Sequence, residues 1–555
     1  MPFGIIDTKD DAPLAGTEYL IQDDSASSQT DLDTTHLKRV LYKGVDTILV
    51  PQPSDDDPND PLLWSTWKRE IAFVTLFFNN IIFAALPGPM LAPSTFALAG
   101  ILGVPVTMIS ELSGYQLLVV GAIGPLVSVL AQKYGKRPQF LFAAVTGTIG
   151  TIICIIGSQR YNYNTLLAGR MIQGLGTTAW ESLSMSAVGD LLYLHERGLR
   201  TAFMVATLTC TPSIVSIIAG AMTQACGWQS LFVASLPFNI VGLIGTIFLL
   251  PETQFRRPVI SRNPVPGKSE QTTERNLGAS AEKAELSVVE TARTTSQPTK
   301  PKKTYIQTLS PMSGSYTEKG ILHLLSEIFV HLANPAVIWI LLVSGVLIAL
   351  FVVSAYITSQ IWSVPPYGLN IAQNGFFYTG SFLGGLLATV AGPLCDWTAR
   401  TLTRLNRGVF EAEFRIPIMA VGALFTSLGW FTFMWDVEHP RPNGYLLGAF
   451  CHGCACFGIS VPSTAAGLYI LDSFPKQSTE IFILQMMLKN FLFYAFSTFI
   501  NKWTAEDGAG FVFRTWGIVS LCLLATCIPM YIFGKVNRRM MSNIHSKYRI
   551  FRAVA

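Results

Sequence analysis

The stretch Arg170-Met171-Ile172-Gln173-Gly174-Leu175-Gly176 lies inside a long apolar run of this 555-residue chain. Twelve such runs are long and apolar enough to cross a bilayer, at about 20 residues for each crossing. A guanidinium group within hydrocarbon is costly, and charged side chains at that depth mark pathways for substrates or protons. The combination predicts a polytopic membrane transporter.

The composition agrees with an all-α membrane protein. Half of the residues are hydrophobic and only 13% are charged, against about 25% in an ordinary soluble protein. The formal net charge of +4 says little about partners, and we expect no nucleic acid among them. The nine cysteines fall nearly all in apolar runs, which favours packing over a disulfide framework.

The apolar runs divide into two groups of six. We place them, within several residues, at 71–92, 112–131, 138–158, 164–189, 201–222, 228–250, 336–360, 371–394, 414–435, 443–470, 480–501 and 511–534. The joins on one side hold few basic residues, whereas the joins on the other side hold several, among them Lys133 to Arg137 and Arg400 to Arg415. The positive-inside rule therefore predicts that both termini are cytoplasmic.

The domain organisation follows from these spans. Residues 1–70 are acidic and polar at their start, without a cleavable signal peptide, and predict a mostly disordered cytoplasmic tail. Two six-helix bundles cover 71–250 and 336–534, and a basic cytoplasmic tail covers 535–555. Residues 251–335 are rich in Ser, Thr, Pro and Lys and predict a flexible cytoplasmic linker, with a small folded domain as the alternative.

Two short loops carry a repeated motif. They are Ser128 to Pro138 after the second span and Gly392 to Arg400 after the eighth. With the six-plus-six layout and Arg170-x-x-Gln173-Gly174-x-Gly176, they resemble the major facilitator superfamily, whose gate motif is Gly-x-x-x-Asp-x-x-Gly-Arg-Arg. The resemblance implies two six-helix bundles around a central cavity that opens alternately to each side, with a substrate site near mid-membrane.

Further stretches resemble the fungal drug:proton antiporter branch of that family, and its subgroup of histidinol and polyamine carriers in particular. The resemblance covers about residues 50–540 and rests on Trp64–Arg69, Trp180–Leu183, Gly189-Asp190, His195–Gly198, Glu411–Arg415, Leu471–Pro475 and Lys489-Asn490. It implies proton-coupled transport in the plasma membrane, with the vacuolar membrane second.

The chain departs from the family pattern at two places. Ser128 and Gln132 stand where the first gate motif has Gly and Asp, so the carboxylate of that half is missing, whereas Gly392 and Asp396 are kept. The fifth span keeps Pro212 of the antiporter motif Gly-Pro-x-x-Gly-Gly but not its glycines. The motifs therefore predict a transporter, and the incomplete antiporter motif gives less support for antiport in particular.

Arg170 and Glu181 are eleven residues apart in the fourth span. At 100° for each residue they share one helix face within about 20°, and they differ in depth by about 16 Å. Opposite charges on one face predict a wet cavity or protein surface rather than lipid. We expect Glu181 to bind a cationic substrate or a proton and Arg170 to tune proton release, and the alternative is that both are structural.

Other polar residues are candidates for the cavity or for the inner gate. The substrate and proton candidates beside Arg170 and Glu181 are Gln173, Asn79, Tyr356, Gln360, Asn374, Lys489 and Asn490. The cytoplasmic gate candidates are Gln132, Lys133, Gly135, Lys136, Arg137, Asp190, Arg197, Asp396 and Arg400. A solvated loop that obeys the positive-inside rule is the alternative for the gate set.

Metal, cofactor and enzyme chemistry are not expected. In Cys451 to Cys456 the first and fourth residues share a helix face, but His452 does not join them, so packing is favoured over a metal site. The chain contains no Gly-x-x-x-x-Gly-Lys-Ser/Thr loop, which argues against an ATP-driven pump. No nucleophile and base can be paired, so no catalytic residue is assigned.

The sequence therefore predicts a proton-coupled secondary transporter that exports a small organic molecule, such as a drug, toxin or secondary metabolite, by alternating access. Uptake of a cationic metabolite such as a polyamine is the alternative, because a cavity glutamate would suit it. A nutrient receptor that binds without transport is the remote alternative. One chain is expected to form the whole path as a monomer.

Overall fold

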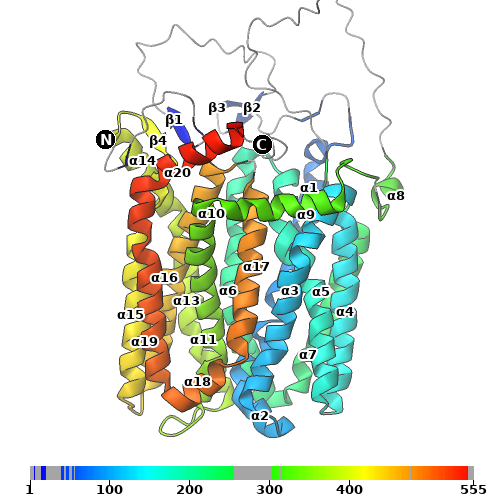
Figure 1. The fold of residues 1–555 in the computed structure, drawn as a ribbon. Helices are drawn as coiled ribbons and strands as arrows, with labels where there is room; N and C mark the ends of the chain where they lie inside the picture. Colours follow the sequence, from blue (N-terminus) through cyan, green and yellow to red (C-terminus); the bar gives the residue numbers. More distant parts are fainter. Residues whose placement is uncertain are drawn as a thin grey trace, which may run out of the picture.

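The computed structural model describes residues 57–255, 303–475 except position 313, and 477–547, together with short pieces at 5–6, 14, 16–19, 39–42, 45–48 and 53–54. Long helices stand side by side in one bundle, and both termini lie at the same end of it (Figure 1). We call this end the inner end, in keeping with the predicted cytoplasmic termini, and the opposite end the outer end.

The N-terminal half begins with a first span that contains a π-helical and a 3-10 segment. The helices of this half are α1 (Thr66–Asn79), the π-helix η3 (Asn80–Ala85), the 3-10 helix η4 (Pro89–Ser94), α2 (Thr95–Leu102), α3 (Val106–Tyr134), α4 (Lys136–Gln159), α5 (Tyr163–Leu191), α6 (Leu194–Cys226) and α7 (Gln229–Leu249). The predicted outer loop at 93–111 is therefore mostly helical, because α2 extends the first span.

The C-terminal half contains more breaks in its helices. It consists of α10 (Pro335–Ile340), the π-helix η6 (Leu341–Val346), α11 (Leu347–Trp362), α12 (Ile371–Phe377), α13 (Thr379–Ala388), α14 (Ala391–Leu405), the 3-10 helix η7 (Ala412–Arg415), α15 (Met419–Glu438), α16 (Gly444–Ser473), α17 (Ser478–Ser497), α18 (Ile500–Asp507), α19 (Ala509–Ala525) and α20 (Cys527–Lys547). Because α20 continues to Lys547, most of the predicted basic tail that the structure describes is helical.

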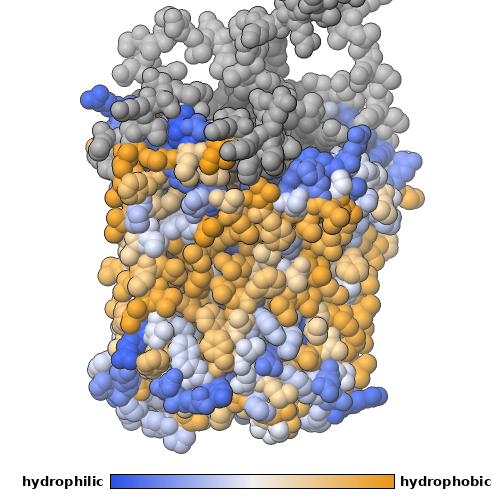
Figure 2. All heavy atoms as spheres, viewed as in Figure 1, coloured by the Kyte–Doolittle hydropathy of each residue, from blue (hydrophilic) through white to orange (hydrophobic). Residues whose placement is uncertain are grey.

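On the face shown in Figure 2, a band of apolar side chains lies between two more polar ends. Among the described residues, ten spans are long and apolar enough to cross a membrane, and α17 with α18, bent by 49°, forms an eleventh. Helix α5, predicted as the fourth span, is not among the spans that pass by length and composition alone. This helix is 29 residues long, but it packs against α3, α4 and η3 rather than against lipid alone, so polar side chains are tolerated on it.

The inner end carries short elements that the sequence did not predict. Strand β1 (Thr17–Tyr19) pairs with β4 (Val409–Glu411), and β2 (Arg39–Tyr42) pairs with β3 (Val45–Ile48), both antiparallel. The remaining elements are η2 (Pro61–Leu63), α8 (Tyr305–Thr308), α9 (Ile321–Val330) and η5 (His331–Ala333).

The prediction of a linker over 251–335 did not include α9, an amphipathic helix that lies across the inner ends of the long helices (Figure 1). Leu324 and Ile328 are buried, and the helix packs against α3 and α17.

The two halves meet along what we call the seam. It consists of α3 against α17 and of α6 against α12 and α13, with η4 against α11 near the outer end. The approach is close: a Cβ on Gly220 of α6 would lie 2.7 Å from the Cα of Gly375 of α12. Small residues of this kind allow helices in a membrane to pack backbone to backbone.

Candidate substrate and proton site

Helix α5 is positioned by its cap and by the glycines of the Arg170 stretch. The Asn162 side chain accepts a hydrogen bond from Thr165 N at 3.1 Å, which begins the helix. A Cβ on Gly174 would lie 2.5 Å from the Gln116 carbonyl of α3, and one on Gly176 would lie 2.4 Å from the Gly147 Cα of α4. The two glycines therefore let α5 lie in direct contact with both neighbouring helices.

Arg170 is fully buried within the N-terminal half. Its guanidinium donates to the Pro87 carbonyl at 2.6 Å, to Gln173 Oε1 at 3.2 Å and to Ser113 Oγ at 3.2 Å. All three acceptors are neutral, and the Arg170 Nε has no partner among the described residues. The contacts join α5 to α3 and to the break after η3, which supports the structural alternative for Arg170.

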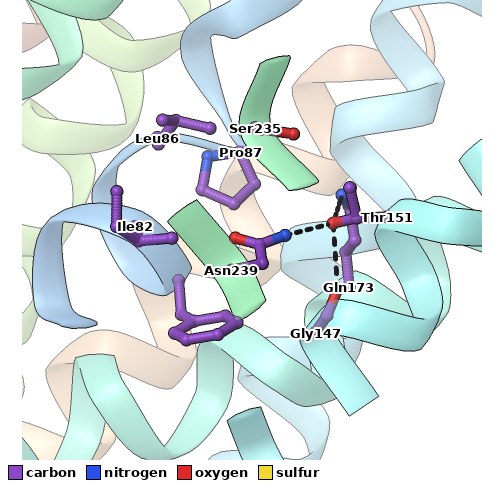
Figure 3. Close-up of a pocket in the computed structure, with 9 residues that line it drawn as sticks. Ile82, Leu86, Pro87, Gly147, Thr151, Gln173, Ser235 and Asn239 are labelled. Carbon is purple, nitrogen blue, oxygen red and sulfur yellow. Dashed lines mark hydrogen bonds between the residues drawn. The ribbon is translucent and has the colours of Figure 1, made fainter. Parts of the chain in front are cut away.

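Gln173 borders a small pocket inside the N-terminal half (Figure 3). Its amide and that of Asn239 both donate to Thr151 Oγ1, at 2.9 and 2.7 Å. The pocket has room for about one water molecule, and Asn239 Oδ1 has no partner in the described part of the chain. Gln173 therefore braces α5 against α4, and Asn239 ties α7 to the same hydroxyl of α4.

Glu181 and Lys489 form an ion pair across the seam. Lys489 Nζ of α17 lies 2.5 Å from Glu181 Oε1 of α5, and their side chains are 26% and 13% exposed. Both residues were predicted as site residues, but their pairing was not. The structure thus joins the two halves by opposite charges in mid-helix.

The three predicted asparagines lie in other places. Asn79 donates to Thr246 Oγ1 at 3.1 Å within the N-terminal half, and Asn374 donates to Ser363 Oγ at 2.7 Å within the C-terminal half. Asn490 packs against Gly121 of α3 in the seam, where a Cβ on the glycine would lie 3.2 Å from the Asn490 Cβ. Its amide is buried without a partner among the described residues.

Tyr356 and Gln360 belong to the outer part of the seam. The Tyr356 hydroxyl donates to the Gly88 carbonyl at 2.8 Å. Gln360 exchanges two hydrogen bonds with Asn501, whose Oδ1 accepts from Ser110 Oγ at 2.7 Å.

One further bond crosses the seam at this level, from Phe96 N to Ser359 Oγ at 3.3 Å. We call the contacts Tyr356–Gly88, Ser110–Asn501 and Phe96–Ser359 the outer latch, because they hold the halves together near the outer end.

The inner end of the N-terminal half carries a charge cluster built from the first gate motif. Lys136 pairs with Asp190 and donates to Ser186 Oγ at 2.7 Å. Arg137 donates to carbonyls at the end of α7, among them Ile247 O at 2.8 Å and Leu250 O. The positive side chain thereby satisfies the last carbonyl groups of α7.

Glu252 completes this cluster. Its carboxylate accepts from the backbone N–H groups of Lys136 and Arg137, both at 3.1 Å, at the start of α4. Burial raises the pKa of this carboxyl above its ordinary value. Gly135 has φ +99°, and a Cβ there would lie 2.2 Å from Glu252 Oε2, so glycine is required for this approach.

Two other first-motif residues reach beyond the N-terminal half. Gln132 donates to Glu480 Oε1 of α17 at 3.4 Å, across the seam. Lys133 donates to the Lys319 carbonyl at 3.2 Å, and its own carbonyl accepts from Tyr316 N at 2.8 Å. The segment before α9 is thus tied to the end of α3.

The second gate motif forms a separate cluster on the C-terminal half. Arg415 bridges Asp396 and Asp472, the latter at 2.8 Å. Arg400 is exposed, and the side chain of Arg197 lies outside the described residues. Among the predicted gate residues, Lys136 and Asp190 thus belong to a cluster on the N-terminal half, and Asp396 belongs to one on the C-terminal half.

Nearby, Arg538 of α20 pairs with Glu411 at 3.0 Å and with Glu413 at 2.5 Å. Thr17 of β1 donates to Glu411 Oε2 at 2.7 Å, which ties the N-terminal strand to this cluster.

His452 lies in the core of the C-terminal half. Its Nε2 is 3.1 Å from Ser354 Oγ, and its ring stacks on Phe351 at a centroid distance of 4.8 Å. In the described part of the chain, no three His, Cys, Asp or Glu side chains are grouped as metal ligands would be.

The sequence interpretation missed several residues of these clusters. They are Ser110, Asn501, Glu252, Glu480, Glu413 and Arg538. Glu411 and Glu413 are separated by one residue, and this spacing could have indicated that they share a cation. Asn501 lies near the end of a predicted span, and its position in the chain gave no indication of its contacts.

Comparison with known proteins places this chain among transporters. A family profile described as the Major Facilitator Superfamily matches residues 71–481. The fold is similar to that of the E. coli xylose transporter XylE in a partially occluded inward open conformation, with a TM-score of 0.55 and 14% identity over 83% of this chain and 97% of that one. At this identity the likeness concerns the fold alone.

Three fungal relatives match most of the chain. An uncharacterized MFS-type transporter of Schizosaccharomyces pombe is 22% identical over 90% of this chain and 89% of its own length. Protein HOL1 of Saccharomyces cerevisiae is 21% identical over 88% and 89%. The probable efflux pump mfs2 of Aspergillus flavus is 22% identical over 76% and 92%.

Proposed function

This chain belongs to the major facilitator superfamily, and from that premise we propose that it exports a small organic molecule in exchange for protons. As a member of the family it is a secondary transporter of the membrane and not an enzyme. The finer proposal, with drugs, toxins or secondary metabolites as cargo, is supported by the similarity to a probable efflux pump. We propose the plasma membrane as its location.

The observation that carries the proposal is the ion pair between Glu181 and Lys489. Alternating access requires contacts between the halves that form in one state and break in another. Protonation of Glu181 would remove its negative charge and weaken the attraction to Lys489. A proton at this position therefore lowers the cost of separating the halves, which is how proton binding is coupled to the change of access.

Flux in sealed vesicles of known orientation tests this coupling. An imposed pH gradient should drive accumulation of labelled weakly basic or neutral drugs against their own gradient. Glu181→Gln should abolish accumulation while downhill exchange persists, because the glutamine cannot take up and release a proton. Glu506→Gln on the exposed side of α18 is the matched control. Equal accumulation by the wild type and Glu181→Gln would refute the proposal.

A second candidate function is uptake of a cationic metabolite such as a polyamine. The Glu181 carboxylate in mid-helix favours it, because a cation could replace Lys489 as its partner. Polyamine entry in the same vesicles, lost in Glu181→Gln, would establish this alternative. Specific binding without flux of any compound would instead establish a receptor.

A further inference from the structure

The Glu181–Lys489 pair lies deep in the bundle. Glu181 is ten residues (181 to 191) from the inner end of α5, and Lys489 is eleven residues (478 to 489) from the inner end of α17. At 1.5 Å for each residue, both lie roughly 15 Å from the inner ends of their helices. Charges at this depth are found where they face a cavity or each other.

The pair is partly accessible and is not enclosed as Arg170 is. Lys489 is 26% exposed and Glu181 13%, whereas Arg170 on the same helix is 0% exposed. Met185, one turn closer to the inner end on the Glu181 face of α5, is 37% exposed. The accessible face of α5 thus carries Glu181 and Met185, and Lys489 of the opposite half reaches it.

The charge balance of the pair restricts what can replace it. A cargo with only a positive group could pair with Glu181, but it would leave the Lys489 ammonium without its partner deep in the bundle. A cargo with only a negative group could pair with Lys489, but it would leave the Glu181 carboxylate without its partner. A neutral cargo offers neither side chain a charged partner, so it compensates neither charge.

Resting on the proposed function, we infer that the cargo is zwitterionic, with its cationic group bound by Glu181 and its anionic group bound by Lys489. Such a molecule separates the two side chains and compensates both. Because one charge comes from each half, the bound zwitterion bridges the halves in place of the direct ion pair. The same site thus recognises the cargo and releases the contact that it replaces.

A set of matched ligands tests this inference before the cargo itself has been identified. Each natural amino acid is used as the zwitterion, its methyl ester as the cation and its N-acetyl derivative as the anion, and equilibrium binding to the full-length protein is measured. At least one amino acid should bind about tenfold more tightly than both of its derivatives. A derivative that binds as tightly as its parent, or the absence of binding by every amino acid, would overturn the inference.

Substitutions assign each charge to its partner. In Glu181→Gln the zwitterion should lose its advantage over the N-acetyl derivative, and in Lys489→Met it should lose its advantage over the ester. If the ion pair were purely structural, each substitution would weaken the binding of all three kinds of ligand to the same extent. If either single variant fails to fold, the double variant Glu181→Lys/Lys489→Glu keeps the pair with its direction reversed, and the zwitterion should still bind more tightly than both derivatives.

Flux separates failure of this inference from failure of the proposed function. Proton-driven accumulation of the drug panel, with every amino acid inert, would overturn the zwitterion and leave the exporter standing. Binding of zwitterions without any proton-driven flux would overturn the proposed proton-coupled export and leave the zwitterion site standing.

Discussion

Removal of the Tyr356 hydroxyl should favour opening of the outer end. This hydroxyl, in a side chain that is 3% exposed, crosses the seam to the Gly88 carbonyl at 2.8 Å. A neutral hydrogen bond contributes about 0.5–1.5 kcal/mol net. In Tyr356→Phe the carbonyl keeps a long contact with Ser113 Oγ at 3.4 Å, so the added cost of an unpaired acceptor is small. A loss of about 1 kcal/mol corresponds to about a fivefold change in the ratio of the two states.

Distance measurements between spin labels at the outer end can detect this change. Arg160 follows α4 and Asn443 precedes α16, and both are exposed at the outer ends of opposite halves. Cysteines at these two positions carry the labels, after the exposed Cys226 and Cys522 have been replaced by serine. The population of the longer separation, relative to the shorter one, should rise about fivefold in Tyr356→Phe.

Tyr378→Phe is the matched control. The Tyr378 hydroxyl donates to the Ala355 carbonyl at 2.6 Å within the C-terminal half, and the side chain is 2% exposed. The control therefore loses the same group at similar burial without loss of a contact across the seam. An equal shift in both variants, or no shift in Tyr356→Phe, would refute the role assigned to the outer latch.

Three further substitutions test how the fold is held together. Arg170→Lys should lower the free energy of unfolding by about 2–4 kcal/mol, because an ammonium cannot reproduce the forked donors of the guanidinium. Thermal unfolding in detergent measures this change. The control Arg400→Lys, on the surface, should leave the free energy of unfolding unchanged. Gly176→Ala should cost about 1–3 kcal/mol by forcing α5 from α4, whereas Gly392→Ala, with nothing within 4 Å of its Cβ, should cost little in the same assay. Burial raises the Glu252 pKa, so between the ordinary value of 4.5 and the raised one the folded protein binds more protons than the unfolded chain. Stability should fall as pH rises through that window, and Glu252→Gln should remove this part of the slope in thermal unfolding at several pH values.

The fold followed from hydropathy because a membrane restricts the possible structures. Backbone groups within hydrocarbon must be paired inside each segment, so a long apolar run becomes a helix. The same logic fails where a helix faces protein: α5 carries Arg170 and Glu181 and is not apolar enough to span by composition. It also fails at the surface, where α9 is only ten residues long and owes its order to packing against α3 and α17.

The site could be predicted only residue by residue. Glu181 and Lys489 are conspicuous because each is a charge in an apolar run, but 308 residues separate them, and nothing local to either one indicates the other. Tyr356 was predicted to face the cavity, and the structure shows its hydroxyl bound to a backbone carbonyl of the other half. A carbonyl acceptor has no signature in the sequence, so contacts of the outer latch emerge only from the packed structure.

The chemistry of the contacts across the seam differs with depth, and this difference bears on the proposed exchange with protons. The outer latch consists of hydroxyl, amide and carbonyl groups, which stay uncharged over the physiological range of pH. The Glu181–Lys489 pair is made of titratable groups, and protonation of its carboxylate changes its energy directly. Under the proposed exchange with protons, a proton on Glu181 weakens the deeper contact and leaves the outer latch unchanged. If the latch were titratable as well, protons would loosen both ends together, and the gradient could not drive access in one direction.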